Sequence, residues 1–163
     1  MKERDGLIQQ YTKRAEPMKK VIALRGISSK GKSQTIRQAY DLLVAKYPQA
    51  RVEHLAKSWG IDIKVVLTIN GVKIGIESRG DPSNRLPESL TEFAEMGCEV
   101  IICATRTRGD TVVAVENLKT THRYEVVWFE QKDAGESESA REAANKNMAM
   151  EMLAEADKVS PLN

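Results

Sequence analysis

The feature that most constrains this chain is a glycine-rich turn set between an apolar run and an amphipathic segment. Residues 26–33 read Gly-Ile-Ser-Ser-Lys-Gly-Lys-Ser, which matches the pattern G-x-x-x-x-G-K-S. The run before it, residues 20–25, is short and apolar, which favours a buried strand. The run after it, residues 33–46, carries apolar side chains at helical spacing. A strand, a glycine-rich turn and a helix in this order are the context in which such a turn binds phosphate.

Each residue type in the turn suits a polyphosphate. Glycine lets main-chain amides approach an anion closely, and the start of a helix adds its dipole and free N–H groups. Lys32 supplies a full positive charge for the β- and γ-phosphates, and the Ser33 hydroxyl is a hard oxygen ligand for Mg²⁺. The residues predicted to contact the nucleotide are Gly26, Ser28, Ser29, Lys30, Gly31, Lys32, Ser33 and Gln34.

Length and charge narrow the class of protein. The 163 residues suit one domain with a sizeable core, with 41% hydrophobic and 29% charged residues. A net charge of +2 argues against strong nonspecific binding to nucleic acid, although a local basic patch stays open. No apolar run approaches a membrane span, and the polar N-terminus lacks the apolar core of a signal peptide. We therefore expect a cytoplasmic protein.

The cysteines and histidines do not form a pattern for metal binding. Cys98 and Cys103 flank a predicted strand, and five extended residues span about 17 Å, too far for a disulfide. Two buried, reduced thiols are therefore expected. His54 and His122 have no other histidine or cysteine near them in the sequence, so structural positions at or near the surface are expected.

An alternating segment predicts a β-hairpin. Apolar side chains alternate through residues 61–69, the turn signal Asn70-Gly71 follows, and the alternation resumes through residues 72–76. A two-residue turn pairs residue 69 with 72, 67 with 74 and 65 with 76, which puts the apolar side chains on one face. The hairpin either buries that single face or places its outgoing strand inside a larger sheet.

The other elements alternate between strand and helix. Residues 50–60 are ambiguous, with a weak strand signal, and we expect a short helix over residues 5–14. Further strands are predicted at 99–104 and 124–129, and helices at 86–96, 111–119 and 136–158. This order predicts a three-layer α/β fold with a mostly parallel sheet of about five strands and an antiparallel hairpin strand at one edge.

The whole chain, residues 1–163, is predicted to be a single domain, with an N-terminal extension over 1–18 and a C-terminal helix over 136–158. That helix carries an apolar stripe for which core contact is the expected role, made of Ala144, Met148, Met152 and Ala156.

A carboxylate facing the glycine-rich turn is expected at the end of a neighbouring strand, because a phosphate-bound Mg²⁺ usually needs one. Glu77 directly follows the apolar run at 72–76 and is the first candidate, and Asp81 is the second. Together with Ser33 they form the predicted metal site. The alternative for Glu77 is a solvent-facing carboxylate at a strand end.

Arginines gather in two loops at the predicted carboxyl ends of strands, where ligands of open α/β sheets bind. Arg79 and Arg85 lie in one loop, and Arg106 and Arg108 in the other. Guanidinium groups bind phosphate bidentately and can stabilise charge on a transferring phosphoryl group. We expect this role for Arg106 and Arg108, with ordinary solvated loop charge as the alternative. Residues 131–133 could border the base of a nucleotide.

The chain resembles the P-loop NTPase superfamily in four residues of the turn, Gly26, Gly31, Lys32 and Ser33. The resemblance extends, by strand–helix order, over about residues 19–130. The resemblance implies a three-layer P-loop sheet and leaves two branches open. Small nucleoside and nucleotide kinases share the size and the arginine-bearing loops, but no acceptor signature is present. Small GTPases share the hairpin after the first helix, followed by D-x-x-G, which here reads E-x-x-G over residues 77–80. The guanine-reading N-K-x-D is replaced by the sequence of residues 105–108, so guanine specificity is unsupported.

These observations predict an enzyme that binds a nucleoside triphosphate, with ATP favoured, together with Mg²⁺, and transfers or hydrolyses the γ-phosphate. The predicted catalytic residues are Lys32, Glu77, Arg106 and Arg108. The acceptor would be water, a small molecule or a protein. One alternative is a switch module with little turnover, in which nucleotide orders the loops at 78–85 and 105–110 for a protein partner or a second copy of the chain. A domain that uses the turn for another anion is the third.

Overall fold

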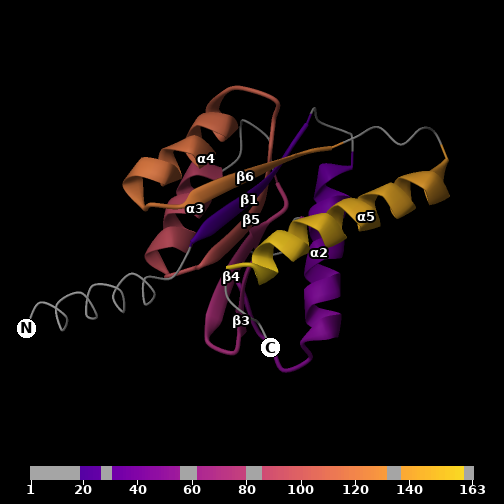
Figure 1. Cartoon of the computed structure of the whole chain (residues 1–163), viewed down its shortest axis with the longest axis horizontal. Helices are drawn as coiled ribbons and strands as arrows, with labels where there is room; N and C mark the ends of the chain where they lie inside the picture. Colours follow the sequence, from indigo (N-terminus) through magenta and orange to yellow (C-terminus); the bar gives the residue numbers. More distant parts are fainter. Residues whose placement is uncertain (1–18, 27–30, 56–61, 80–85, 132–136, 160–163) are drawn as a thin grey trace, which may run out of the picture.

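The computed structural model describes residues 19–26, 31–55, 62–79, 86–131 and 137–159. Within these ranges the chain forms six strands and four helices (Figure 1), and three of the strands follow one another between α2 and α3. The strands are β1 (Lys20–Arg25), β2 (Arg51–His54), β3 (Lys64–Ile69), β4 (Val72–Glu77), β5 (Val100–Thr105) and β6 (Glu125–Glu130). The helices are α2 (Lys32–Lys46), α3 (Leu86–Glu95), α4 (Asp110–Thr121) and α5 (Glu138–Asp157). The predicted N-terminal extension over 1–18, with its short helix, lies outside the described residues.

The strands form one mixed, mostly parallel sheet in the order β2-β3-β4-β5-β1-β6. β5 pairs in parallel with β1 and β4, and β6 pairs in parallel with β1. β3 alone runs against the others, because it pairs antiparallel with both β2 and β4. The predicted α/β class and the mostly parallel sheet are therefore confirmed.

Two details of the predicted sheet were wrong. The described sheet has six strands and not five, because the ambiguous segment forms β2. The antiparallel hairpin strand β3 is second from the edge, and β2 is the edge strand. β2 is held by main-chain pairing to β3, and its side chains are mostly exposed, so it has little of the apolar pattern that reveals a strand in a sequence.

The predicted hairpin register is confirmed. Ile69 pairs with Val72 across the turn, and the pairs 67–74 and 65–76 follow. Asn70 and Gly71 both have positive φ angles, 50° and 82°, as a two-residue turn of this kind requires. Of the two arrangements left open by the sequence, the second is correct, because the outgoing strand β4 pairs with β5 inside the main sheet.

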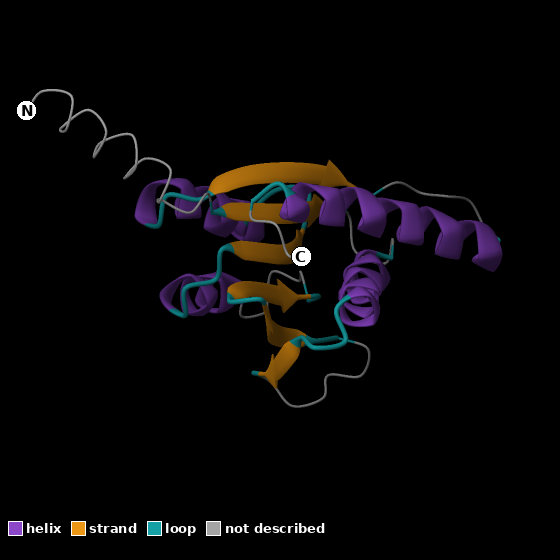
Figure 2. Ribbon diagram, turned by 60° about the horizontal axis from the view of Figure 1, so that its bottom comes forward, coloured by secondary structure: helices purple, strands orange, loops and turns teal. Residues whose placement is uncertain are grey.

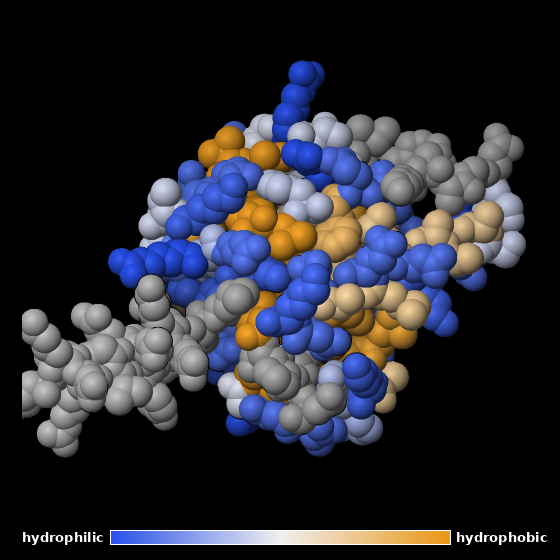
Figure 3. All heavy atoms as spheres, viewed as in Figure 1, coloured by the Kyte–Doolittle hydropathy of each residue, from blue (hydrophilic) through white to orange (hydrophobic). Residues whose placement is uncertain are grey.

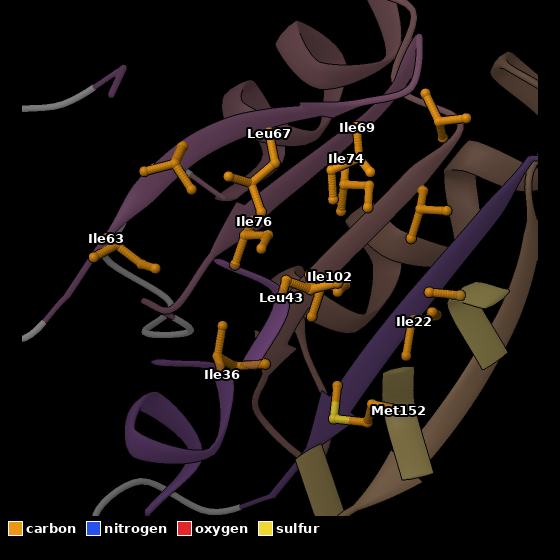
Figure 4. Packing of buried hydrophobic residues seen from close by; sticks show 14 of the residues in the cluster. Ile22, Ile36, Leu43, Ile63, Leu67, Ile69, Ile74, Ile76, Ile102 and Met152 are labelled. Atoms are coloured by element: carbon orange, nitrogen blue, oxygen red, sulfur yellow. The ribbon is translucent and has the colours of Figure 1, made fainter. Parts of the chain in front are cut away.

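Helices cover both faces of the sheet, which makes three layers (Figure 2). Alternate residues of β1 belong to different cores: Ile22 and Leu24 pack in one cluster, Val21 and Ala23 in the other. The first cluster lies beneath α2 and α5 and includes Ile36, Leu43 and Met152 (Figure 4). The second lies beneath α3 and α4 and includes Leu90, Phe93, Val115 and Leu118. Burial on both faces explains why the central strands read as continuous apolar runs.

The helix α5 uses three of the four residues of its predicted apolar stripe for core contact, whereas Ala144 belongs to neither core cluster. Met152 and Ala156 are buried in the cluster beneath α2 and α5, and Met148 packs against it. The predicted bounds agree with the observed ones to within two residues for the four described helices and for most strands. In Figure 1 α5 crosses α2, and its N-terminal half extends past it.

Cys98 and Cys103 are buried, reduced thiols, as expected. His54 is exposed and His122 half-buried, which also fits the prediction. On the face shown in Figure 3, hydrophilic side chains separate the hydrophobic ones into patches. Among the described helices, none combines the length and the apolar character that a membrane span requires.

We expect Gly75→Ala to lower the free energy of unfolding by about 1–3 kcal/mol, because a Cβ there overpacks the core. That atom would lie 2.6 Å from Cγ of Phe93, a ring that is fully buried against β4. Urea denaturation of both proteins measures the difference. In the double variant with Phe93→Leu the two losses should sum to more than the observed loss, and strict additivity would contradict this packing argument.

Both cysteines should resist alkylation in the native protein. Burial raises the pKa of Cys98 to about 12, and it also raises the pKa of Cys103. At pH 8 the thiolate fraction of each is therefore negligible, and the reagent cannot reach the sulfur. Iodoacetamide labelling followed by mass spectrometry should show two modified cysteines only after denaturation. Rapid labelling of the folded chain would show that these residues are accessible.

Candidate functional site

The candidate site lies where the carboxyl ends of β1, β5 and β4 meet the start of α2. The main-chain N–H of Gly26 donates to the Thr105 carbonyl at 3.2 Å, which joins the ends of β1 and β5. Predicted site residues Ser28, Ser29, Lys30 and Asp81 lie outside the described residues, as does Arg85. The others are described, and they fall into groups that the fold either brings together or separates.

Gly31 sets the start of α2. Its φ and ψ of 87° and 14° are in the left-handed region, which glycine adopts without the strain that a side chain would cause. The carbonyl of Gly31 accepts the first helical hydrogen bond, from the N–H of Thr35 at 3.0 Å. Gly31 thus begins a 15-residue helix whose N-terminus lies at the strand ends.

Lys32 is buried at this point, with 7% of its surface exposed. Its ammonium group donates to the carbonyls of Gly26 and Thr105, the latter at 2.6 Å. Two carbonyl oxygens at the ends of parallel strands offset part of the cost of burying the charge. The arrangement places a positive charge between β1, β5 and the first turn of α2.

Ser33 connects α2 to β4. Its hydroxyl donates to the carbonyl of Ser78 at 3.2 Å, one residue beyond the end of the strand. The fold therefore brings Ser33 and the end of β4 together, although β5 lies between β4 and β1 in the sheet.

Glu77 is fully buried, which rules out the solvent-facing alternative. Its neighbour Ile76 belongs to the core beneath α2 and α5, so strand alternation puts the Glu77 side chain on the face that α3 and α4 cover. Cys103 is its pairing partner on β5 and belongs to that second core. Burial and, to a lesser degree, the charge of Glu77 raise the pKa of Cys103, as expected for neighbours in the register of β4 and β5. The main chain at the end of β4 thus meets Ser33, while the Glu77 carboxylate points to the opposite face.

Asp62 lies beside the contact between Ser33 and Ser78, and sequence reasoning missed this carboxylate. Its Oδ1 accepts from the Ser78 hydroxyl at 2.9 Å, and the same hydroxyl oxygen accepts from the N–H of Ile63 at 2.9 Å. Arg79 lies near it, with Nε 3.8 Å from Oδ2 of Asp62. The only sequence signal was an acidic residue at the start of an alternating run, and that did not distinguish Asp62 from a surface charge.

The two arginines of the loop after β5 differ in setting. Arg106 is half-buried and directly follows Thr105, whose carbonyl accepts from Lys32. Its main-chain N–H donates to the Thr111 hydroxyl at 3.0 Å, which fixes the loop against the start of α4. Arg108 is exposed, as the alternative of ordinary loop charge would have it. Of the two arginines, Arg106 is therefore the nearer in the chain to Thr105, the residue that contacts Lys32.

Thr35, Gln131 and Asn145 form a polar cluster next to Gly31. Oε1 of Gln131 is 3.1 Å from the Thr35 hydroxyl, and its Nε2 donates to Oδ1 of Asn145 at 2.9 Å. Asn145 also donates to Oε1 of Gln34 at 3.4 Å, although Gln34 itself is exposed. Sequence reasoning placed Gln131 near a ligand but missed the other two, since neither lies in a recognisable motif.

A polar groove between α2 and α5 begins at Gln34. Two adjoining hollows of about 320 and 450 Å³ share Gln38 and Glu142 in their walls. Arg37 and Arg141 line the hollow nearer to Gln34. Both hollows are open to the surface, and Gln34 at one end directly follows the glycine-rich turn in the chain.

For a hard cation, the described part of the site offers one predicted ligand, the Ser33 hydroxyl. In the part of the chain that the structure describes, three or more His, Cys, Asp or Glu side chains do not gather into a metal site. Mg²⁺ commonly takes one or two protein oxygens and completes its shell with water and phosphate oxygens. The Ser33 hydroxyl at the end of β4 fits that pattern.

Neither a protein-family model nor a curated protein matches this chain in sequence. The functional assignment therefore depends on the chemistry and geometry of the site.

Lys32→Met should lower the free energy of unfolding by about 1–3 kcal/mol even without a nucleotide, because two buried carbonyls lose a charged donor. Lys46→Met is the matched control, since Lys46 lies at the far end of the same helix with its side chain 58% exposed. Urea denaturation should show a loss for the first variant and almost none for the second. Equal stability of the two variants would mean that the Lys32 contacts contribute nothing to the fold.

Proposed function

We propose that this chain is a Mg²⁺-dependent nucleoside-triphosphate-binding protein of the P-loop type, with ATP as the favoured nucleotide, that transfers or hydrolyses the γ-phosphate. The observation that carries the proposal is the position of Lys32. Its buried ammonium lies at the N-terminus of α2 and at the carboxyl ends of β1 and β5. A lysine charge, a helix N-terminus and a glycine-rich turn converge there, and each of these favours a polyphosphate.

In this proposal the amides of residues 26–33 and the Lys32 ammonium hold the β- and γ-phosphates. The ammonium would exchange the Gly26 and Thr105 carbonyls for phosphate oxygens, which are stronger acceptors for a charged donor. The polar groove that begins at Gln34 offers room for the nucleoside next to the turn.

Ser33 would hold the metal, and Mg²⁺ would neutralise charge on the phosphate oxygens. Its hydroxyl already meets the end of β4 through the Ser78 carbonyl. A bridging water would link the ion to a carboxylate, with Glu77 the candidate from the sequence. The Glu77 side chain lies on the face beneath α3 and α4, so the end of β4 would have to turn for Glu77 to take this role. The variant Glu77→Gln tests the role.

Arg106 and Arg108 would neutralise charge that develops during phosphoryl transfer. Arg106 follows the residue whose carbonyl holds Lys32, which supports its assignment more than that of the exposed Arg108. The bound acceptor is left open between water, a small molecule and a protein.

The order of the strands bears on the two branches of the resemblance. β5 separates β1 from β4, so Glu77 ends a strand that is not adjacent to the strand before the turn. The strand order therefore does not support a GTPase-like role for the E-x-x-G sequence over 77–80, because β4 is not adjacent to the strand before the turn. Residues 105–108 also lack a guanine-reading sequence, and ATP stays the favoured nucleotide.

ATP with Mg²⁺ should raise the melting temperature of the chain, because a ligand that binds only the native state stabilises it, by about 2.7 kcal/mol at a hundred times Kd. A panel of ATP, GTP and sulfate, each with and without Mg²⁺, is read by thermal shift. Lys32→Ala should remove the shift relative to its own ligand-free melting temperature, whereas Lys46→Ala should keep it. The absence of a shift with any triphosphate would refute the proposal.

Steady phosphate release, or transfer to an added acceptor, separates an enzyme from a switch module. In an enzyme, Arg106→Ala should lower the rate about a hundredfold and leave ATP affinity nearly unchanged. Glu77→Gln is the test of the carboxylate: a loss of rate at constant affinity supports its role, and an unchanged rate removes it from the site. Tight binding with negligible turnover would favour the switch.

A further inference from the structure

The Gln131 side chain lies close to both glycines of the motif, Gly26 and Gly31. A Cβ built on Gly26 would lie 3.0 Å from Cβ of Gln131, and one on Gly31 would lie 3.6 Å from Nε2 of Gln131. The N–H of Gln131 donates to the Arg25 carbonyl at 2.8 Å, so its main chain is fixed to the end of β1. Gln131 therefore lies close to both Gly26 and Gly31, the two described residues that flank positions 27–30.

The side chain of Gln131 is held from two helices. The Thr35 hydroxyl of α2 lies 3.1 Å from Oε1, and the same hydroxyl lies 3.1 Å from the Gly31 carbonyl. Asn145 of α5 accepts from Nε2 at 2.9 Å. Its own Nδ2 would be 3.2 Å from a Cβ at Gly31, so Asn145 also packs directly on the turn.

The burial of Asn145 indicates that its amide does more than pack α5 against α2. Only 4% of its surface is exposed, and its neighbours on the inner side of α5 are apolar, Ala149, Met152 and Ala156. Burying an amide costs free energy unless it is paired, and an apolar side chain would pack α5 against α2 without that cost. What the amide adds is a fixed orientation for Gln131 and Gly31.

We propose that Gln131 is a positioning residue for the phosphate-binding loop, held in place by Thr35 and Asn145. The three side chains, here called the loop clamp, fix the separation and direction of Gly26 and Gly31. Phosphate affinity then depends on α5, a helix that contributes no residue to the motif. The inference rests on the proposed function, because it concerns how well the same loop binds a nucleotide.

Affinity for Mg·ATP tests the clamp. Gln131→Leu and Asn145→Leu should each weaken binding roughly tenfold, since each removes one or two hydrogen bonds that order the loop. The double variant should be no weaker than about either single one, because both act through the same contact. Asn147→Leu is the matched control, because Asn147 is an exposed asparagine on the same helix as Asn145. This control should bind like the parent chain.

Thr35 provides the conservative pair. Thr35→Val keeps the shape and removes the hydroxyl, whereas Thr35→Ser keeps the hydroxyl. The clamp requires Val to weaken binding and Ser to restore most of it. Equal affinities for the two variants would overturn the role of this hydroxyl in the clamp.

Amide hydrogen exchange gives a second readout that needs no nucleotide. Gln131→Leu and Asn145→Leu should speed exchange at residues 31–36, and Asn147→Leu should not. If the parent chain binds no triphosphate while exchange changes as expected, the three side chains order the start of α2, but the proposed function fails and the clamp has no role in nucleotide binding. If the parent chain binds ATP and the clamp variants match the control in either affinity or exchange, the clamp is overturned. Weaker binding without faster exchange would instead indicate direct contact with the nucleotide.

Discussion

The arrangement of the site depends on one buried charge. The Lys32 ammonium lies between the carbonyls that end β1 and β5, at the first residue of α2. Because an unpaired charge could not be buried there, the two strand ends and the helix start must keep their relative positions. Gly31 makes this possible, since its left-handed conformation turns the chain into the helix directly before the lysine. The contact is both a structural tie and the place where a phosphate would compete for the same donor.

The two faces of the sheet carry different groups around the Lys32 charge. The face beneath α2 and α5 carries the starting turn of α2, the Ser33 contact to Ser78 and the polar cluster with Gln131. The face beneath α3 and α4 holds Glu77 and Cys103 in a mostly apolar core. A carboxylate at a strand end can thus be close to the site in the sequence and lie on the other side of the sheet. Alternation along the strand, with a period of two residues, decides the side.

Much of the fold was predictable, because local patterns determine it. The Asn70-Gly71 turn and the alternation around it specified the hairpin register, and continuous apolar runs revealed strands covered on both faces. β2 was ambiguous, because an edge strand that is mostly exposed depends on main-chain bonds to its neighbour and leaves little apolar pattern. The order of the strands was not predictable either, since pairing between β5 and both β1 and β4 depends on segments far apart in the chain.

The same division holds for the candidate site. The sequence alone determined the chemical character of residues 26–33, the helix that follows them and the prediction of a phosphate ligand, because these depend on residue types at fixed spacing. Only the tertiary structure decided that Lys32 reaches the end of β5, that Ser33 meets Ser78, that Glu77 faces away, and that Gln131 and Asn145 pack on Gly31. Those contacts join residues separated by up to 114 positions, since Gly31 lies that far from Asn145 (145 − 31). Their geometry comes from the packing of whole layers, which spacing along the chain does not encode.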